Sequence, residues 1–209
     1  MILATLLATA CTTETYDSGD GDYSYLLAEF VEIHTADSKQ VDYAINDAGK
    51  HITFTKPITV RWAATPDSLY RALLYYNNAP AGVKLLSVSQ VHVLRPKDKD
   101  SIDNHATDPV TFESIWQSEN GRWLNLSLLV KTGKSNDEDA FQLIGMMRST
   151  DEDNMLRLTL MHDQGTIPQY YTTRVYVSIP LGDDVQLPLR LTVNTYEGPF
   201  TQTIVNQGE

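Results

Sequence analysis

The second half of the chain alternates aliphatic and polar residues with a period of two, and this pattern constrains the fold more than any other feature. Every second residue is aliphatic across most of 122–130. The same alternation recurs at 156–162, 173–179 and 187–193. One apolar and one polar face on each segment is typical of antiparallel strands that pack on a core and face water.

Three further segments, 111–116, 140–147 and 199–205, bring the number of predicted strands in residues 110–209 to seven. Short strands separated by turns are typical of an immunoglobulin-like antiparallel β-sandwich. The only cysteine is Cys11. Contact between the two sheets must therefore rest on aliphatic side chains rather than on a disulfide.

Residues 23–97 predict a second, smaller all-β domain. Its strand-like segments are 24–35, 41–46, 51–54, 58–62 and 83–94. Turn residues at 47–50 join two of them into a predicted hairpin. The segment 70–76 fits a strand or a helix, and we favour a strand. Strands in this number predict a small Greek-key barrel of the OB type, because closure removes exposed edges.

A polar connector, residues 98–109, separates the two predicted domains. The sequence thus predicts an all-β chain, with an OB-like barrel over 23–97 followed by a sandwich over 110–209. The net charge of −11 argues against a nucleic-acid partner. Arg61, Arg71 and the aromatic residues of the barrel could in principle contact nucleic acid, but we interpret the aromatics as core.

The amino-terminal residues predict where in the cell the protein is located. Residues 1–10 are apolar or small, like the apolar part of a signal peptide. They carry no Lys or Arg, so we expect the natural start to lie upstream of Met1. Leu7–Cys11 resembles the lipobox of bacterial lipoproteins, which implies that Cys11 is acylated and anchors the chain to a membrane. Residues 11–22, with four acids and no base, then form a polar tether.

The run 110–130, VTFESIWQSENGRWLNLSLLV, resembles the carboxy-terminal domain of the NigD-like lipoproteins of Bacteroidetes. The segments LRLTLMHD (156–163) and TRVYVSIPL (173–181) resemble the same domain. This resemblance implies an OB-like domain, a β-sandwich and a lipoprotein signal. It also implies a place in the cell envelope, at the outer membrane. The biochemical role of the family is not established.

No motif in the sequence predicts a cofactor or a metal. The five histidines lack the spacing of metal ligands, and no nucleotide-binding fingerprint occurs. The acidic clusters 136–139 and 151–154 are interpreted as hairpin turns. His162 could orient a nucleophile, but no nucleophile elbow accompanies it. The sequence therefore predicts no catalytic residue.

Two other sets of residues are candidates for sites. Trp116 and Trp123 bracket a turn and could stack on sugar rings, although tryptophans packed between sheets are commoner. Ser68 and Ser101 each lie in an Asp-Ser-aliphatic sequence that resembles the O-glycosylation signal of exported Bacteroidetes proteins.

These features predict a membrane-anchored, non-enzymatic lipoprotein of the cell envelope that binds a protein or an envelope component. Two alternatives stay open. One is a carbohydrate-binding module, based on the aromatic residues. The other is a bacteriocin-associated, immunity-type accessory protein, which rests only on the name of the family that the chain resembles.

Overall fold

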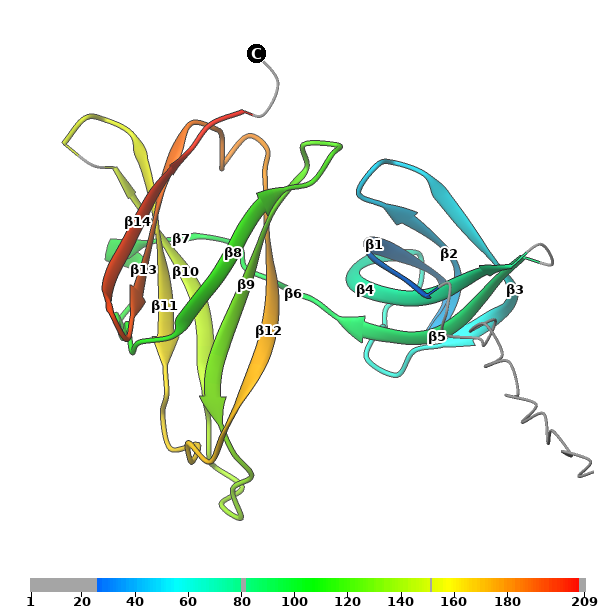
Figure 1. The fold of residues 1–209 in the computed structure, drawn as a ribbon, viewed down its shortest axis with the longest axis horizontal. Coiled ribbons are helices and arrows are strands. Elements are labelled where there is room, and N and C mark those ends of the chain that lie inside the picture. Colours follow the sequence, from blue (N-terminus) through cyan, green and yellow to red (C-terminus); the bar gives the residue numbers. More distant parts are fainter. Residues whose placement is uncertain (1–25, 80–81, 151, 207–209) are drawn as a thin grey trace, which may run out of the picture.

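The computed structural model describes residues 26–79, 82–150 and 152–206 (Figure 1). Apart from a 3-10 turn, η1 (Lys99–Ser101), its regular elements are β-strands. The predicted signal peptide, Cys11 and the whole predicted tether, residues 11–22, lie outside the described residues. No helix in the described part of the chain is long and apolar enough to cross a membrane.

The amino-terminal domain is a closed five-stranded barrel. Its strands are β1 (Leu26–Asp37), β2 (Gln40–Asn46), β3 (His51–Thr59), β4 (Ser68–Ala79) and β5 (Gly82–Gln90). They pair in the order β1-β2-β3-β5-β4, and β4 pairs back onto β1. This small barrel confirms the predicted OB-like domain.

The predicted hairpin is formed by β2 and β3. The side chain of Asn46 accepts hydrogen bonds from the backbone N–H groups of Ala48 and Lys50, and Gly49 takes a φ of +79°. Such side-chain acceptance and a left-handed glycine are what a tight turn requires. The two strands expected at 51–54 and 58–62 are instead one strand, β3, whose pairing with β2 contains a register shift.

The segment that fitted strand or helix forms β4, which pairs with β1 along ten residues. Ala72, Leu74 and Tyr76 point into the barrel core. Arg71 and Leu73 point outward but are also buried, because the second domain covers them. A strand buried on both faces shows no apolar-polar alternation, which explains the ambiguous sequence pattern.

The chain passes from the barrel to the sandwich at Val91. The strand expected over 83–94 divides there: β5 stays in the barrel, whereas β6 (His92–Val93) pairs with a sandwich strand. A second short strand, β7 (Lys97–Asp98), also pairs in the sandwich. Residues 92–98 therefore belong to the sandwich sheets rather than to the barrel, because their backbone groups find partners there (Figure 1).

The carboxy-terminal domain is a sandwich of two sheets. Its further strands are β8 (Thr111–Gln117), β9 (Trp123–Thr132), β10 (Leu143–Thr150), β11 (Leu156–Asp163), β12 (Tyr171–Pro180), β13 (Leu189–Thr195) and β14 (Gly198–Ile204). One sheet has the order β14-β13-β11-β10-β7 and the other the order β6-β12-β9-β8. All seven strands predicted for residues 110–209 are present.

The sandwich is not purely antiparallel, in contrast to the prediction. Strand β13 pairs parallel to β11, and the short strands β6 and β7 pair parallel to β12 and β10. The chain reaches β13 from β11 by crossing to the other sheet through β12, and this crossover gives the parallel direction. The core between the sheets is aliphatic, with Leu124, Leu126 and Leu128 of β9 fully buried.

The domain junction as a candidate functional site

Two barrel strands present a stripe of side chains to the outer face of the β6-β12-β9-β8 sheet. Alternation within β1 and β4 turns three cross-strand pairs outward from the barrel: Glu32 with Arg71, Phe30 with Leu73, and Ala28 with Tyr75. Alternation in the sandwich sheet turns its own polar and aromatic residues toward them: Trp116, Trp123, Asn125, Ser127, Tyr176 and Ser178. The junction is therefore built from the non-core faces of both domains.

A buried guanidinium lies at the centre of this junction. The Arg71 side chain is 1% exposed and donates two hydrogen bonds to the Asp47 carboxylate, at 2.5 and 2.9 Å. It also donates to the Asn125 side chain at 3.0 Å and to the Ser178 hydroxyl at 3.1 Å. Asp47 comes from the β2–β3 turn, whereas Asn125 and Ser178 come from the sandwich. One side chain thus joins both domains.

Aromatic rings enclose the Arg71 guanidinium. Its central carbon lies 4.8 Å from the centroid of the Trp123 ring and 5.4 Å from that of Phe30. Phe30 in turn meets Trp116 and Tyr176 in edge-to-face contacts, with centroids 5.3 and 5.4 Å apart. These contacts exclude water from the guanidinium and strengthen its electrostatic attraction to Asp47.

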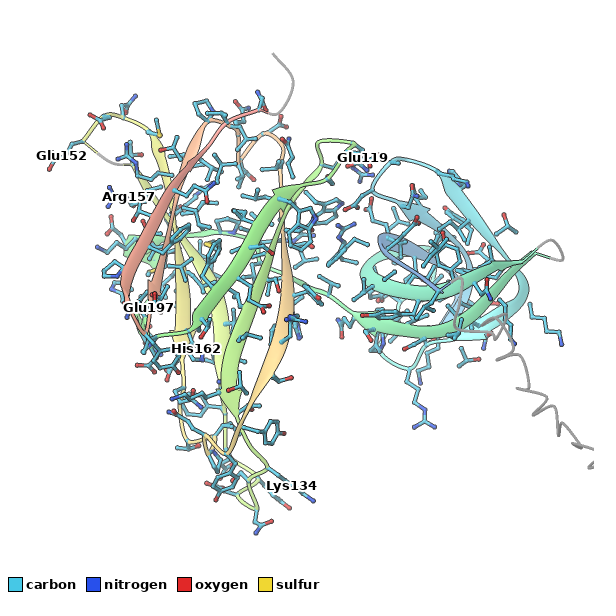
Figure 2. All side chains as sticks on the ribbon, in the orientation of Figure 1. Glu119, Lys134, Glu152, Arg157, His162 and Glu197 are labelled. Carbon is cyan, nitrogen blue, oxygen red and sulfur yellow. The ribbon has the colours of Figure 1, made fainter. Side chains whose placement is uncertain are left out.

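The hairpin that joins β8 and β9 adds further contacts between the sandwich and the barrel. The backbone N–H of Asn120 donates to the Asp47 carbonyl at 2.8 Å, and Arg122 forms an ion pair with the buried Glu32 at 2.8 Å. Figure 2 shows Glu119 at the tip of this hairpin, beside the barrel. The Glu32–Arg71 end of the barrel stripe and the neighbouring β2–β3 turn are therefore held by polar contacts to the sandwich.

Both predicted sugar-contact tryptophans lie at this junction. Trp123 is buried beneath Arg71, and its indole Nε1 has no hydrogen-bond partner among the described residues. Trp116 is only half-buried and lines two hollows at the junction. The two rings therefore do not form one exposed platform, and Trp116 is the one with ring surface left for a ligand.

The remaining candidates lie elsewhere. Ser68 is half-buried at the start of β4 and donates to the Pro66 carbonyl, and Ser101 is exposed in η1 and donates to the Asp98 carbonyl. Their glycosylation stays a prediction. His162 is buried, with Nδ1 3.1 Å from the Asp108 carbonyl and Nε2 3.0 Å from the Gln142 amide. Both of its ring nitrogens thus have structural partners.

The acidic clusters do not form a metal centre in the part of the chain that the structure describes. Across residues 26–79, 82–150 and 152–206, no group of three or more His, Cys, Asp or Glu side chains could hold an ion. Sequence reasoning missed the Arg71 network, whose members are far apart in the chain. The available signal was a single arginine within the apolar segment YRALLYY.

Of the openings at the junction, one lies between the β2–β3 turn and the β8–β9 hairpin, and two others are candidate sites. The larger, which we term the interdomain groove, has a volume of about 780 Å³ and is lined by β4, the segment 90–95 and the open side of the sandwich. Its walls include Tyr70, His92, Val130, Leu143, Thr173 and Val175. The smaller, which we term the aromatic hollow, has a volume of about 440 Å³ and is lined by Tyr75, Glu113, Trp116, Ser127, Arg174 and Tyr176.

A bidentate ion pair lies in the aromatic hollow. The Arg174 guanidinium donates to both oxygens of Glu113, at 2.6 and 2.7 Å, and the Ser127 hydroxyl donates to the same carboxylate at 2.7 Å. These hydrogen bonds, that from Arg174 first, lower the pKa of Glu113 to about 2. The carboxylate therefore stays ionised throughout the neutral and mildly acidic range.

Near the carboxy-terminal end of β1, His34 bridges two carboxylates. Its Nδ1 lies 2.7 Å from Asp42 and its Nε2 lies 3.2 Å from Asp67. The hydrogen bond to Asp42 is the main cause that raises the pKa of His34 above its ordinary value of 6.5. Tyr43 stacks on the His34 ring, with centroids 4.5 Å apart.

We expect Arg71→Ala to lower the free energy of unfolding by about 3–5 kcal/mol, because it leaves the Asp47 carboxylate without its cation in a mostly buried place. Urea unfolding followed by tryptophan fluorescence measures this loss, since Trp123 lies against Arg71. The control is Arg148→Ala, which breaks a more exposed bidentate pair with Asp98. Equal losses in the two variants would contradict a special role for the junction.

We expect the stability of the barrel to fall as pH rises through the raised pKa of His34. A group whose pKa is higher in the folded state contributes stability that is fully present below its unfolded value, here 6.5, and is lost above its folded value. Thermal unfolding from pH 5 to 9 measures this effect against His34→Gln. Parallel pH profiles for the two proteins would show that His34 does not contribute.

Comparisons with solved structures identify the fold. A NigD-like immunity protein from Bacteroides caccae ATCC 43185 matches with a TM-score of 0.63 and 19% identity, over 86% of this chain and 93% of that chain. A toxin-related protein from Parabacteroides distasonis ATCC 8503 matches with a TM-score of 0.60 and 17% identity, over 86% of this chain and 92% of that chain. A DUF1344 protein of unknown function from Bacteroides vulgatus ATCC 8482 matches with a TM-score of 0.63 and 14% identity, over 87% of this chain and 91% of that chain.

No protein-family model and no curated protein matches the sequence. The structural matches cover both domains and span nearly the whole length of the proteins compared. The resemblance found in the carboxy-terminal segments is therefore confirmed at the level of the complete fold: this chain has the two-domain, all-β architecture of the NigD-like proteins.

Proposed function

We propose that this protein is a binding protein of the cell envelope, anchored to a membrane through an acylated Cys11, which holds a partner in the interdomain groove. The observation that carries the proposal is the buried Arg71 network. Because it ties the barrel to the sandwich, the groove between them has fixed walls, as preorganised binding sites require.

The chemistry of the groove suits an extended polypeptide. It opens between the two sheets of the sandwich, where the half-buried Val175 and the exposed Leu143 line it. Within the described residues, the edge of β10 that faces β7 and the edge of β12 that faces β6 are only partly paired. Strand β7 pairs with β10 only at Met147 and Arg148, and β6 pairs with β12 only at two residues. An extended segment that adds to such an edge gains main-chain hydrogen bonds and apolar contacts together.

The proposal contains no catalytic step. The histidine that could have oriented a nucleophile, His162, is 1% exposed and contacts a backbone carbonyl and an amide side chain. The solved structures that share the fold are described as an immunity protein, a toxin-related protein and a protein of unknown function. These descriptions are compatible with a non-enzymatic accessory role.

An immunity-type role is the second candidate. It is favoured by the description of the Bacteroides caccae structure as a NigD-like immunity protein. In that case the groove partner would be a secreted bacteriocin or the receptor through which the bacteriocin acts. The two candidates share the groove and differ only in the partner.

We expect Leu143→Arg to abolish recovery of the partner, because it places a charge and a long side chain at the mouth of the groove. The measurement is affinity purification from native membranes followed by mass spectrometry. The control is Val205→Arg, since Val205 is 59% exposed and Leu143 is 56% exposed, but only Leu143 lines the groove. The same partners with both variants would exclude the groove, and a bacteriocin among them would favour the immunity role.

We expect metabolic labelling with a fatty-acid analogue to mark the wild-type protein and not Cys11→Ser. Two acyl chains are needed for stable anchoring, because each buried methylene contributes only about 0.8 kcal/mol. Fractionation should accordingly find the wild type in membranes and the variant released from them. An unlabelled wild-type protein would exclude the anchor without bearing on the groove.

A further inference from the structure

The aromatic hollow shares no lining residue with the interdomain groove. It lies where the third pair of the barrel stripe, Ala28 and Tyr75, meets the outer face of the sandwich sheet. The first two pairs of the stripe include buried side chains, whereas Tyr75 is only half-buried. The hollow is thus the place where the docked surfaces begin to separate, and its volume of about 440 Å³ falls within the usual range for small-ligand sites.

Aromatic side chains from both domains line the hollow. Tyr75 comes from the barrel, and Trp116 and Tyr176 come from the sandwich. Phe30 fixes the positions of Trp116 and Tyr176 through its edge-to-face contacts with both. Phe30 lines the hollow as well, and all four rings are half-buried, so each is held in place and still offers surface to a ligand. Rigid rings with one accessible side suit the apolar face of another ring.

The polar groups of the hollow are held in place as well. A register shift between Phe112 and Ser114 makes Glu113 the extra residue of a β-bulge, and bulges re-aim a side chain. Arg174 has five N–H groups and donates two of them to Glu113. The other three are available to Tyr176, to solvent or to a ligand. The side chain of Arg174 is 53% exposed, so a ligand can reach it.

The charges of the hollow restrict the class of ligand. Its lining contains one carboxylate, Glu113, and one guanidinium, Arg174, which neutralise each other. An anion would meet Glu113 and the negative protein, and a cation would meet Arg174. A purely apolar ligand would remove water from the ion pair without replacing its hydrogen bonds, and this desolvation would weaken binding. These considerations leave a neutral ligand that combines hydroxyl groups with an apolar face.

We propose that the aromatic hollow binds a sugar residue of a neutral glycan, with its apolar C–H face against the aromatic rings and its neighbouring hydroxyls on Arg174 and Glu113. Each hydroxyl can both donate and accept, so one pair of hydroxyls serves the guanidinium and the carboxylate together. This site goes beyond the proposed binding of a partner in the groove and does not depend on it.

The test is an array of neutral and acidic glycans, probed with the full chain carrying Cys11→Ser to avoid lipidation. The wild-type protein should bind at least one neutral oligosaccharide. It should bind no acidic glycan more tightly than it binds that oligosaccharide. Arg174→Gln and Tyr75→Ala should each weaken this binding about tenfold or more, because a hydrogen bond to a charged group or a stacked ring is lost. Circular dichroism and thermal unfolding confirm that each variant is folded.

Matched controls come from the sandwich. Arg148→Gln alters another bidentate arginine pair, and Tyr170→Ala removes a tyrosine that is 78% exposed; neither residue lines the hollow. Both should bind as the wild type does. The proposal is overturned if no neutral glycan binds, if acidic glycans bind better, or if an extended peptide displaces the glycan more effectively than free oligosaccharide. It is also overturned if Arg174→Gln and Arg148→Gln weaken binding equally.

Discussion

The charge of Arg71 is the constraint on which the rest of the structure depends. A guanidinium with almost no exposure is tolerated only when its donors are satisfied and its charge is paired. The barrel supplies Asp47, and the sandwich supplies Asn125 and Ser178. Complete compensation is therefore reached only when both domains are folded and docked. The interdomain groove and the aromatic hollow both open beside this fixed contact.

The openings differ in chemistry, and this difference separates two kinds of recognition. The interdomain groove exposes partly paired strand edges and aliphatic side chains, which suit a polypeptide. The aromatic hollow combines half-buried rings with a neutralised ion pair, which suits a sugar. A membrane-anchored protein with both sites could hold a protein and a glycan at once. The junction that positions both sites makes their geometry mutually dependent.

The sequence predicted the sandwich strands well because one of their faces is polar, so that alternation is visible in Leu124, Leu126 and Leu128. It left β4 ambiguous, because Ala72 faces the barrel core and Arg71 is covered by the sandwich. The candidate site was harder to predict. Trp116 and Trp123 were found because tryptophan is rare, but their placement at a domain junction depends on long-range docking that no local pattern encodes.

The passage from β5 to β6 carries a consequence for how this architecture can change over evolutionary time. Val91, at the crossing, is 3% exposed, and its N–H donates to the Arg71 carbonyl, while the N–H of Leu94 donates to the carbonyl of Ser178 in the neighbouring strand β12. No spacer separates the modules here. Recombination at this point would sever hydrogen bonds in both bodies, so barrel and sandwich are expected to be inherited as a single genetic cassette rather than exchanged with unrelated modules.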